Sequence, residues 1–91
     1  MKKSLHTQTR QIANRLARIE GHVAAIRSMV LEDRPCPDVL TQLAAVRAAL
    51  DQVGRLVLSD HLAHCVVDAA RRGDARRTLA DLEAALERYF R

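Results

Sequence analysis

The sequence predicts an all-α protein whose 91 residues form a three-helix subunit. Two observations predict this fold class. Ala, Arg, Leu and Val are the commonest residues, and this Ala-, Arg- and Leu-rich mixture favours helices over strands. Hydrophobic residues recur at alternating spacings of three and four, which is the repeat of one helix face. The length suits one domain that spans residues 1–91.

The first helix is expected over residues 5–31 and the second over residues 38–72. Between them, Pro35 is expected to stop the first helix, and Pro37 fits the first turn of the second because proline lacks an N–H donor. The apolar seam of the first helix consists of Ile12, Leu16, Ile19, Val23, Ile26 and Val30. The matching seam of the second helix consists of Val39, Leu43, Val46, Leu50, Val53 and Val57.

Gly73 is expected to cap the second helix, and a third helix follows over residues 74–89. A helix over residues 38–72 would be about 50 Å long, which exceeds what a globule of this size needs. Such a chain cannot bury all its apolar stripes alone. We therefore expect an antiparallel four-helix-bundle dimer, with close helix approach near Ala48 and Ala49.

The net charge of +4 is concentrated near the start of the chain. Residues 1–31 hold six basic residues and one acidic residue, which points to a polyanion such as nucleic acid, although a solvated basic face is the alternative. No segment reaches the roughly 20 apolar residues of a membrane span. No apolar run follows Lys2 and Lys3, so we expect a cytoplasmic protein with reduced cysteines.

The residues with metal-binding chemistry are Cys36, His61 and Cys65, with His64 beside them. His61 and Cys65 are four residues apart and would share one helix face, but that spacing alone is a weak signal. A helix from Cys36 to His61 is about 37 Å long, so all three ligands can meet only between two antiparallel long helices of different subunits. The alternative is a buried cysteine at a helix start and a histidine on the surface.

Two thiolates and one imidazole form a soft, three-coordinate set that suits Cu(I). A structural zinc site needs a fourth ligand. His64 or His6 can supply one, so Zn(II) and Ni(II) remain alternatives.

The chain resembles the copper-sensitive operon repressor (CsoR) family, within a wider group that also contains nickel/cobalt, formaldehyde and persulfide sensors. The resemblance covers essentially the whole chain. It rests on Arg15-Leu16 with Ile19-Glu20-Gly21-His22, on Gln42-Leu43-Ala44-Ala45-Val46-Arg47, and on Cys36 with His61-Leu62-Ala63-His64-Cys65. The Cys/His/Cys pattern matches the copper sensors, since nickel/cobalt sensors carry His at the last position and use an N-terminal histidine.

The resemblance implies a homodimer or homotetramer whose metal-free form binds double-stranded operator DNA and is released by Cu(I). It also implies DNA contacts from Arg15 and Arg55, which match the family's basic positions, with Arg18 and Arg47 nearby. The supporting Tyr and Glu of the copper sensors are replaced by Pro35 and Asp81. Asp81 or Glu83 on the third helix is expected to accept a hydrogen bond from the metal-bound histidine.

Two other functions remain open from the sequence. One is a nickel- or zinc-responsive repressor of the same family, and the other is a helical DNA-binding protein with no metal response. An enzyme is not expected, because the chain has no Gly-rich phosphate loop, no nucleophile elbow and little room for a substrate pocket.

Overall fold

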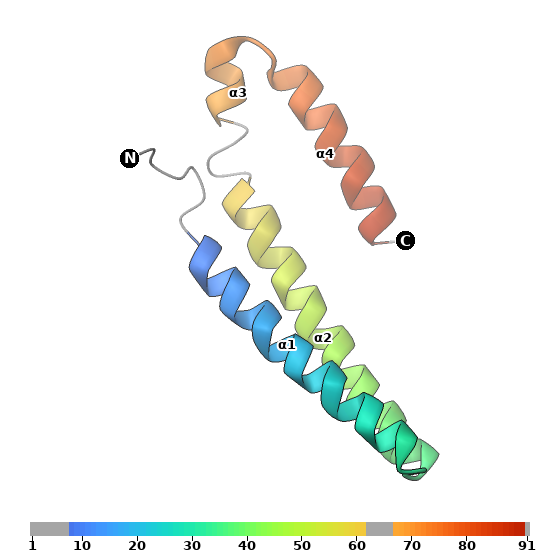
Figure 1. Ribbon diagram of the computed structural model, residues 1–91. Helices are drawn as coiled ribbons and strands as arrows, with labels where there is room; N and C mark the ends of the chain where they lie inside the picture. The colour runs from blue at the N-terminus through green and yellow to red at the C-terminus, as the bar shows by residue number, and fades with distance from the viewer. Residues whose placement is uncertain (1–7, 62–66, 91) are drawn as a thin grey trace. The chain divides into compact units, whose positions relative to one another are not determined.

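The computed structural model describes residues 8–61 and 67–90, and Figure 1 shows the helices in these ranges. The helices are α1 (Thr9–Leu31), α2 (Cys36–His61), α3 (Val67–Arg72) and α4 (Ala75–Tyr89). The described residues contain no β-strand, which confirms the predicted all-α class. None of the described helices is both long enough and apolar enough to cross a membrane.

The helix boundaries agree with the sequence prediction to within a few residues where they are described. α2 begins at Cys36, two residues before the predicted start, and α4 begins at Ala75, one residue after it. α2 and α3 cover the two ends of the helix predicted over residues 38–72, whose residues 62–66 lie outside the described part. The predicted start of α1 at residue 5 also lies outside it.

α1 ends through its own backbone rather than through Pro35, which the sequence assigned to this role. Asp33 adopts the left-handed conformation with φ of 55°. Its N–H donates to the carbonyl of Val30 at 3.1 Å, and the N–H of Arg34 donates to the carbonyl of Met29 at 3.0 Å. This pair of bonds is the Schellman motif, and it satisfies carbonyls that the end of the helix would otherwise leave unpaired.

Pro35 instead begins α2. Its carbonyl accepts the N–H groups of Asp38 at 3.0 Å and Val39 at 3.2 Å, so Pro35 occupies the position just before the helix. Pro37 then lies in the first turn, as predicted, where its missing N–H has no helical partner to lose. Both prolines thus lie at a helix boundary as expected, but Pro35 begins α2 rather than ending α1.

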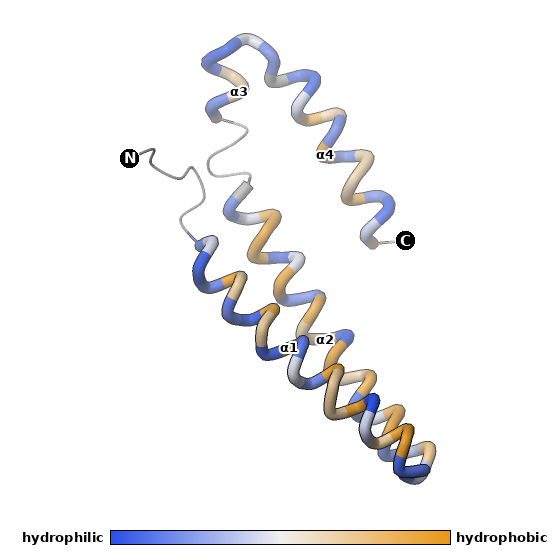
Figure 2. The backbone as a smooth tube through the Cα atoms, viewed as in Figure 1, coloured by the Kyte–Doolittle hydropathy of each residue, from blue (hydrophilic) through white to orange (hydrophobic). Residues whose placement is uncertain are grey.

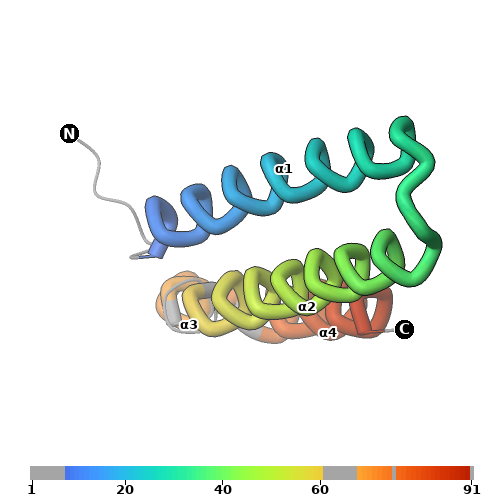
Figure 3. The backbone as a smooth tube through the Cα atoms, turned by 90° about the horizontal axis from the view of Figure 1, so that it is seen from below, coloured from blue at the N-terminus to red at the C-terminus, as the bar shows by residue number. Residues whose placement is uncertain are grey.

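The chain divides into two compact units, and the first, Gln8–Leu58, is an antiparallel hairpin of α1 and α2. Figure 3 shows the two helices of the hairpin running side by side. Residues seven apart on each helix form the core of this unit, since seven residues are close to two helical turns. The buried members are Ile19, Ile26, Val46 and Val53, with Ile12, Val39 and Ala49 packed against them.

Of the twelve apolar residues that the sequence placed on its two seams, the hairpin buries four and partly buries two. The other six are 40–56% exposed, and we call them the exposed apolar stripe. Figure 2 shows hydrophobic positions recurring along both helices of the hairpin. The stripe consists of Leu16, Val23 and Val30 on α1 and of Leu43, Leu50 and Val57 on α2.

The second unit contains α3 and α4, joined by a tight turn at Gly73. Gly73 adopts the left-handed conformation with φ of 82°. Its N–H donates to the carbonyl of Ala70 at 3.2 Å, and the N–H of Asp74 donates to the carbonyl of Ala69 at 3.0 Å. This second Schellman motif confirms the cap that the sequence assigned to Gly73. Arg72 also forms two ion pairs, from Nη1 to Asp68 Oδ2 at 3.3 Å and from Nε to Asp74 Oδ1 at 4.0 Å. These ion pairs link α3 to the turn that follows it.

Candidate metal centre and nucleic-acid interface

Cys36 is the first residue of α2, and its thiol is exposed. Three features of the local backbone hold this position. Pro35 precedes the helix, Pro37 follows in the first turn, and the Thr41 hydroxyl donates to the Pro37 carbonyl at 2.9 Å. Arg34 adds an ion pair with Asp38 at 3.9 Å. An exposed thiol on a well-fixed helix start is accessible to a metal ion.

Cys36 and His61 occupy the two ends of the same helix, because α2 runs over 26 residues from one to the other. At 1.5 Å per residue their backbones are about 37 Å apart. Metal–ligand bonds to sulfur and nitrogen are only about 2.0–2.3 Å long. Within one chain, these two residues therefore cannot bind the same metal ion.

The remaining predicted ligands, Cys65, His64 and His6, lie outside the described residues. Within the described ranges, no group of three or more His, Cys, Asp or Glu side chains could hold a metal ion. Asp81 and Glu83, the predicted partners of the metal-bound histidine, are exposed on α4. The complete ligand set thus stays a prediction.

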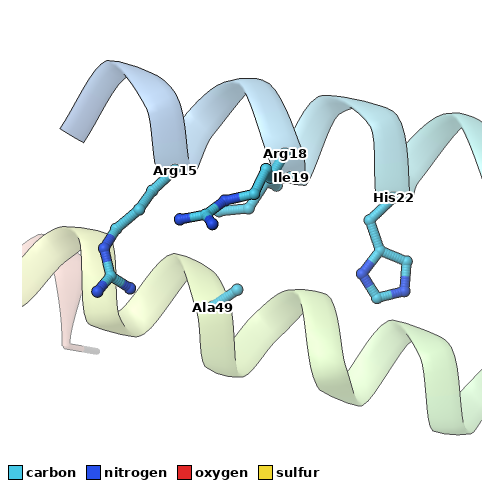
Figure 4. A pocket seen from close by; sticks show the side chains of 5 residues that line it. All are labelled: Arg15, Arg18, Ile19, His22 and Ala49. Carbon is cyan, nitrogen blue, oxygen red and sulfur yellow. The ribbon is translucent and has the colours of Figure 1, made fainter. Parts of the chain in front are cut away.

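A groove of about 230 Å³ lies between α1 and α2, and Figure 4 shows the side chains that line it. Arg15, Arg18, Ile19 and His22 come from α1, and Ala49 comes from α2. Ala49 is partly buried and packs against the core between α1 and α2. Only Ala48 of the predicted close-approach pair remains exposed.

Two polar pairs join the helices along this groove. Arg15 Nη1 donates to Gln52 Oε1 at 3.1 Å, and His22 Nε2 donates to Gln42 Oε1 at 2.7 Å. The sequence prediction missed these cross-helix contacts. Arg15 and His22 follow the same three-and-four spacing as the buried core. Because both residues are polar, the hydrophobic repeat that predicted the seam did not include them.

The four arginines predicted to contact DNA fall into two groups. Arg15 and Arg18 line the groove, and Arg15 is partly buried there. Arg47 and Arg55 are exposed on α2 and are not among the residues that line the groove. A surface that used all four would have to extend beyond the groove and over α2.

Comparison with known families decides the class of protein. A family model described as metal-sensitive transcriptional repressor matches residues 8–88, which spans both units of the chain. The chain belongs to this family. The family's role is transcriptional repression rather than catalysis.

Individual members of the metal-sensitive repressor family resemble the chain closely. The copper-sensing transcriptional repressor CsoR of Bacillus subtilis (strain 168) is 44% identical over 79 residues, covering 87% of this chain and 78% of its own length. The crystal structure of the copper-sensing repressor CsoR with Cu(I) from Geobacillus thermodenitrificans NG80-2 has a TM-score of 0.88 and 36% identity, covering 100% of this chain and 95% of that one. The nickel-responsive transcriptional regulator InrS has a TM-score of 0.74 and 47% identity, covering 98% and 99%.

Proposed function

We propose that this metal-sensitive repressor binds double-stranded operator DNA in its metal-free form and leaves it when Cu(I) binds at Cys36, His61 and Cys65 of two different subunits. One observation carries the inter-subunit part of the proposal. Cys36 and His61 lie at opposite ends of α2, so a site that uses both needs a second chain.

The donor set favours Cu(I) among the common metals. Two cysteine sulfurs and one imidazole nitrogen are soft ligands, and three such ligands suit Cu(I), whereas a structural zinc site needs a fourth ligand. The similarity to copper-sensing repressors supports the same choice. Cys36 contributes a thiol that is already exposed at the start of α2.

The exposed apolar stripe supports the assembly that this site requires. Apolar side chains that recur every seven residues on both helices are typical of a helix-bundle interface. A second antiparallel hairpin packed on the stripe would complete a four-helix bundle. By two-fold symmetry it would create two equivalent sites per dimer, and two such dimers would form the homotetramer.

The DNA contacts of the proposal come from Arg15, Arg18, Arg47 and Arg55. The last three are exposed in the described structure, and each guanidinium can donate to phosphate oxygens in a forked geometry. In the metal-bound form, the second ring nitrogen of His61 would hydrogen-bond to Asp81 or Glu83. That bond would connect the metal site to α4 and favour an assembly that no longer fits DNA.

Mixing two inactive variants tests the shared site. The Cys36→Ala and Cys65→Ala variants are unfolded separately, mixed in equal amounts and refolded together under reducing, anaerobic conditions. The mixture is then titrated with Cu(I) against a competing chelator. A mixed dimer has one intact site, because the intact Cys36 of one subunit meets the intact Cys65 of the other. With random pairing, the mixture should bind about one quarter of an equivalent of Cu(I) per subunit tightly.

Each variant refolded alone is the matched control and should bind no Cu(I) tightly. If the mixture also fails to bind, although light scattering reports the same assembly as for the parent, the ligands do not come from two subunits. In a parallel experiment, Cu(I) should lower the affinity of the parent for operator DNA. Unchanged affinity would contradict the repressor mechanism.

A nickel-responsive repressor is the second candidate, because the nickel-responsive regulator InrS is 47% identical to this chain. In that case His6 or His64 would add a nitrogen ligand. Ni(II) prefers a square-planar site with four ligands, and Cu(I) here would have three. X-ray absorption of the two metal-loaded forms distinguishes these sites. DNA release by Ni(II) but not by Cu(I) would favour the second candidate.

A further inference from the structure

Four arginines flank the tight turn between α3 and α4 in the second unit (Figure 1). We call them the arginine cluster, and it consists of Arg71, Arg72, Arg76 and Arg77. All four residues are exposed. Residues 71–77 contain these four bases and one acid, Asp74, so this short segment carries a net charge of +3. The function proposed above gives no role to this charge.

Arg72 neutralises the two carboxylates that are nearest to the cluster in the chain. It forms ion pairs with Asp68 at 3.3 Å and with Asp74 at 4.0 Å, so these carboxylates compete less for the other three arginines. The Schellman bonds at Gly73 fix the backbone of the same turn. Groups on a fixed backbone lose less conformational entropy when they bind a partner. The turn therefore holds its remaining charges ready for an external anion.

The other three arginines form no ion pair with a carboxylate among the described residues. Two of them, Arg76 and Arg77, lie in the first turn of α4, which contains no acidic residue. Positive charge at this end of a helix is unfavourable, because the helix dipole is also positive there. The placement therefore does not stabilise α4, and a bound anion would offset the repulsion.

The remainder of α4 has the opposite charge. Residues 78–89 contain three acidic residues, Asp81, Glu83 and Glu87, and one basic residue, Arg88. A polyanion is therefore attracted to the turn and repelled by the rest of the helix. This division disfavours an anionic membrane, because a helix that lies on a membrane is typically basic along its polar face. DNA fits better, since its backbone can offer phosphates to a local cluster.

We propose that the arginine cluster binds backbone phosphates of DNA, with Arg71, Arg76 and Arg77 as the donors and Arg72 as the residue that neutralises the nearby carboxylates. A guanidinium can donate two parallel N–H bonds to phosphate oxygens, so these side chains suit this ligand. Such contacts carry no sequence information and add affinity for any duplex. The proposal rests on the DNA binding proposed above, and it adds a second surface to the one on α1 and α2.

A DNA titration of the full-length, reduced, metal-free protein tests this surface. Anisotropy of a fluorescent GC-rich duplex is measured over a series of salt concentrations, so no operator sequence is needed. Arg71→Gln, Arg76→Gln and Arg77→Gln should each weaken binding about two- to fivefold, the size expected for one exposed charge pair. Each should also make the slope of log affinity against log salt shallower by about one unit.

Two further variants and a stability measurement separate binding from an effect on the fold. Arg88→Gln removes the same charge from the acidic part of α4 and should leave the affinity and the salt slope unchanged. Asp74→Asn removes the one acid of the segment and a partner of Arg72, so it should strengthen binding and steepen the slope. Thermal unfolding should show that Arg76→Gln and Arg77→Gln are at least as stable as the parent, because each removes an unfavourable charge from the start of α4.

The outcomes distinguish this proposal from the repressor function. If the parent binds the duplex and all cluster variants keep its affinity and salt slope, the proposal is wrong while the repressor function stands. A parent that binds no duplex would overturn both. No step uses Cu(I), so a parent that ignores copper would contradict the repressor mechanism without changing this result. Vesicles of phosphatidylserine and phosphatidylcholine are the second probe, and cluster variants that lose vesicle binding but keep DNA binding would replace DNA with a membrane surface.

Discussion

Leu16 and Ile19 lie three residues apart on α1, yet Ile19 is 9% exposed and Leu16 is 40% exposed. The two residues belong to one predicted seam, but only Ile19 faces α2 within the hairpin. The same division is found on α2, where Val46 is buried and Leu43 is exposed. One seam therefore serves two contacts, the first inside the chain and the second available to another copy.

The exposed apolar stripe leads to a prediction about assembly. Leu43→Glu should shift the protein towards monomer, because the substitution places two carboxylates in the proposed apolar interface of the dimer. Light scattering at micromolar concentration measures the change. Ala24→Glu adds the same charge on an exposed position of α1 outside the stripe and should leave the assembly unchanged. A dimer or tetramer that survives Leu43→Glu would place the interface elsewhere.

The thiols lead to a prediction about metal affinity. Cys36→Ala should abolish tight Cu(I) binding with the helical content retained, because a three-ligand site that loses one sulfur has no good geometry left. Cys65→Ala should behave in the same way. Competition with a Cu(I) chelator under anaerobic conditions measures affinity, and circular dichroism checks the fold. Parent-like binding of one Cu(I) per subunit by either variant would exclude the proposed ligand set.

His61 should matter more for signalling than for affinity. Two sulfurs alone can hold Cu(I) in a linear arrangement, so His61→Ala should still bind copper, but it should lose the link to Asp81 or Glu83. Coupling between two sites is typically about 1–3 kcal/mol, so Cu(I) should weaken DNA binding of the parent about 5- to 150-fold and that of His61→Ala far less. Fluorescence anisotropy with and without one equivalent of Cu(I) measures both. A full response in His61→Ala would assign the signal to another group.

The exposed arginines of α2 should act mainly through phosphate charge. Arg55→Ala should weaken DNA binding and make the slope of log affinity against log salt shallower, by about one unit for each phosphate that the variant no longer neutralises. Arg47→Ala is the parallel case. Cu(I) affinity should stay the same in both variants, since neither residue is a proposed ligand. Salt slopes equal to that of the parent would leave α2 without a role in binding DNA.

Two glycines should respond to alanine in opposite ways. Gly21 lies within α1, and nothing is within 4 Å of an added Cβ, so Gly21→Ala should stabilise the fold by about 0.5–1 kcal/mol. Gly73 has φ of 82°, so Gly73→Ala should destabilise the fold by about 1 kcal/mol despite similar free space. Urea unfolding at fixed protein concentration measures both. A loss of stability in Gly21→Ala would indicate that another subunit packs on that face.

The residue pattern alone determined the class of the fold and the family resemblance. Spacings of three and four predicted helices that the structure contains, and the αL glycine at residue 73 was recognisable because only glycine adopts that conformation freely. The resemblance read from the Arg15–His22 and Cys36–Cys65 motifs was confirmed by the family match. Local propensities and side-chain chemistry are properties of the sequence itself, so they can be read without coordinates.

Only the tertiary structure decided which apolar residues are buried within a single chain. Leu16 and Ile19 are equivalent by hydrophobicity and spacing, and the difference between them depends on the side from which α2 approaches. The same approach brings Gln52 to Arg15 and Gln42 to His22, although these partners are 37 and 20 residues apart. It also packs Ala49 against the core between the two helices. Such contacts follow from how two helices rotate against each other to bury the most apolar surface, and no local sequence signal specifies that rotation.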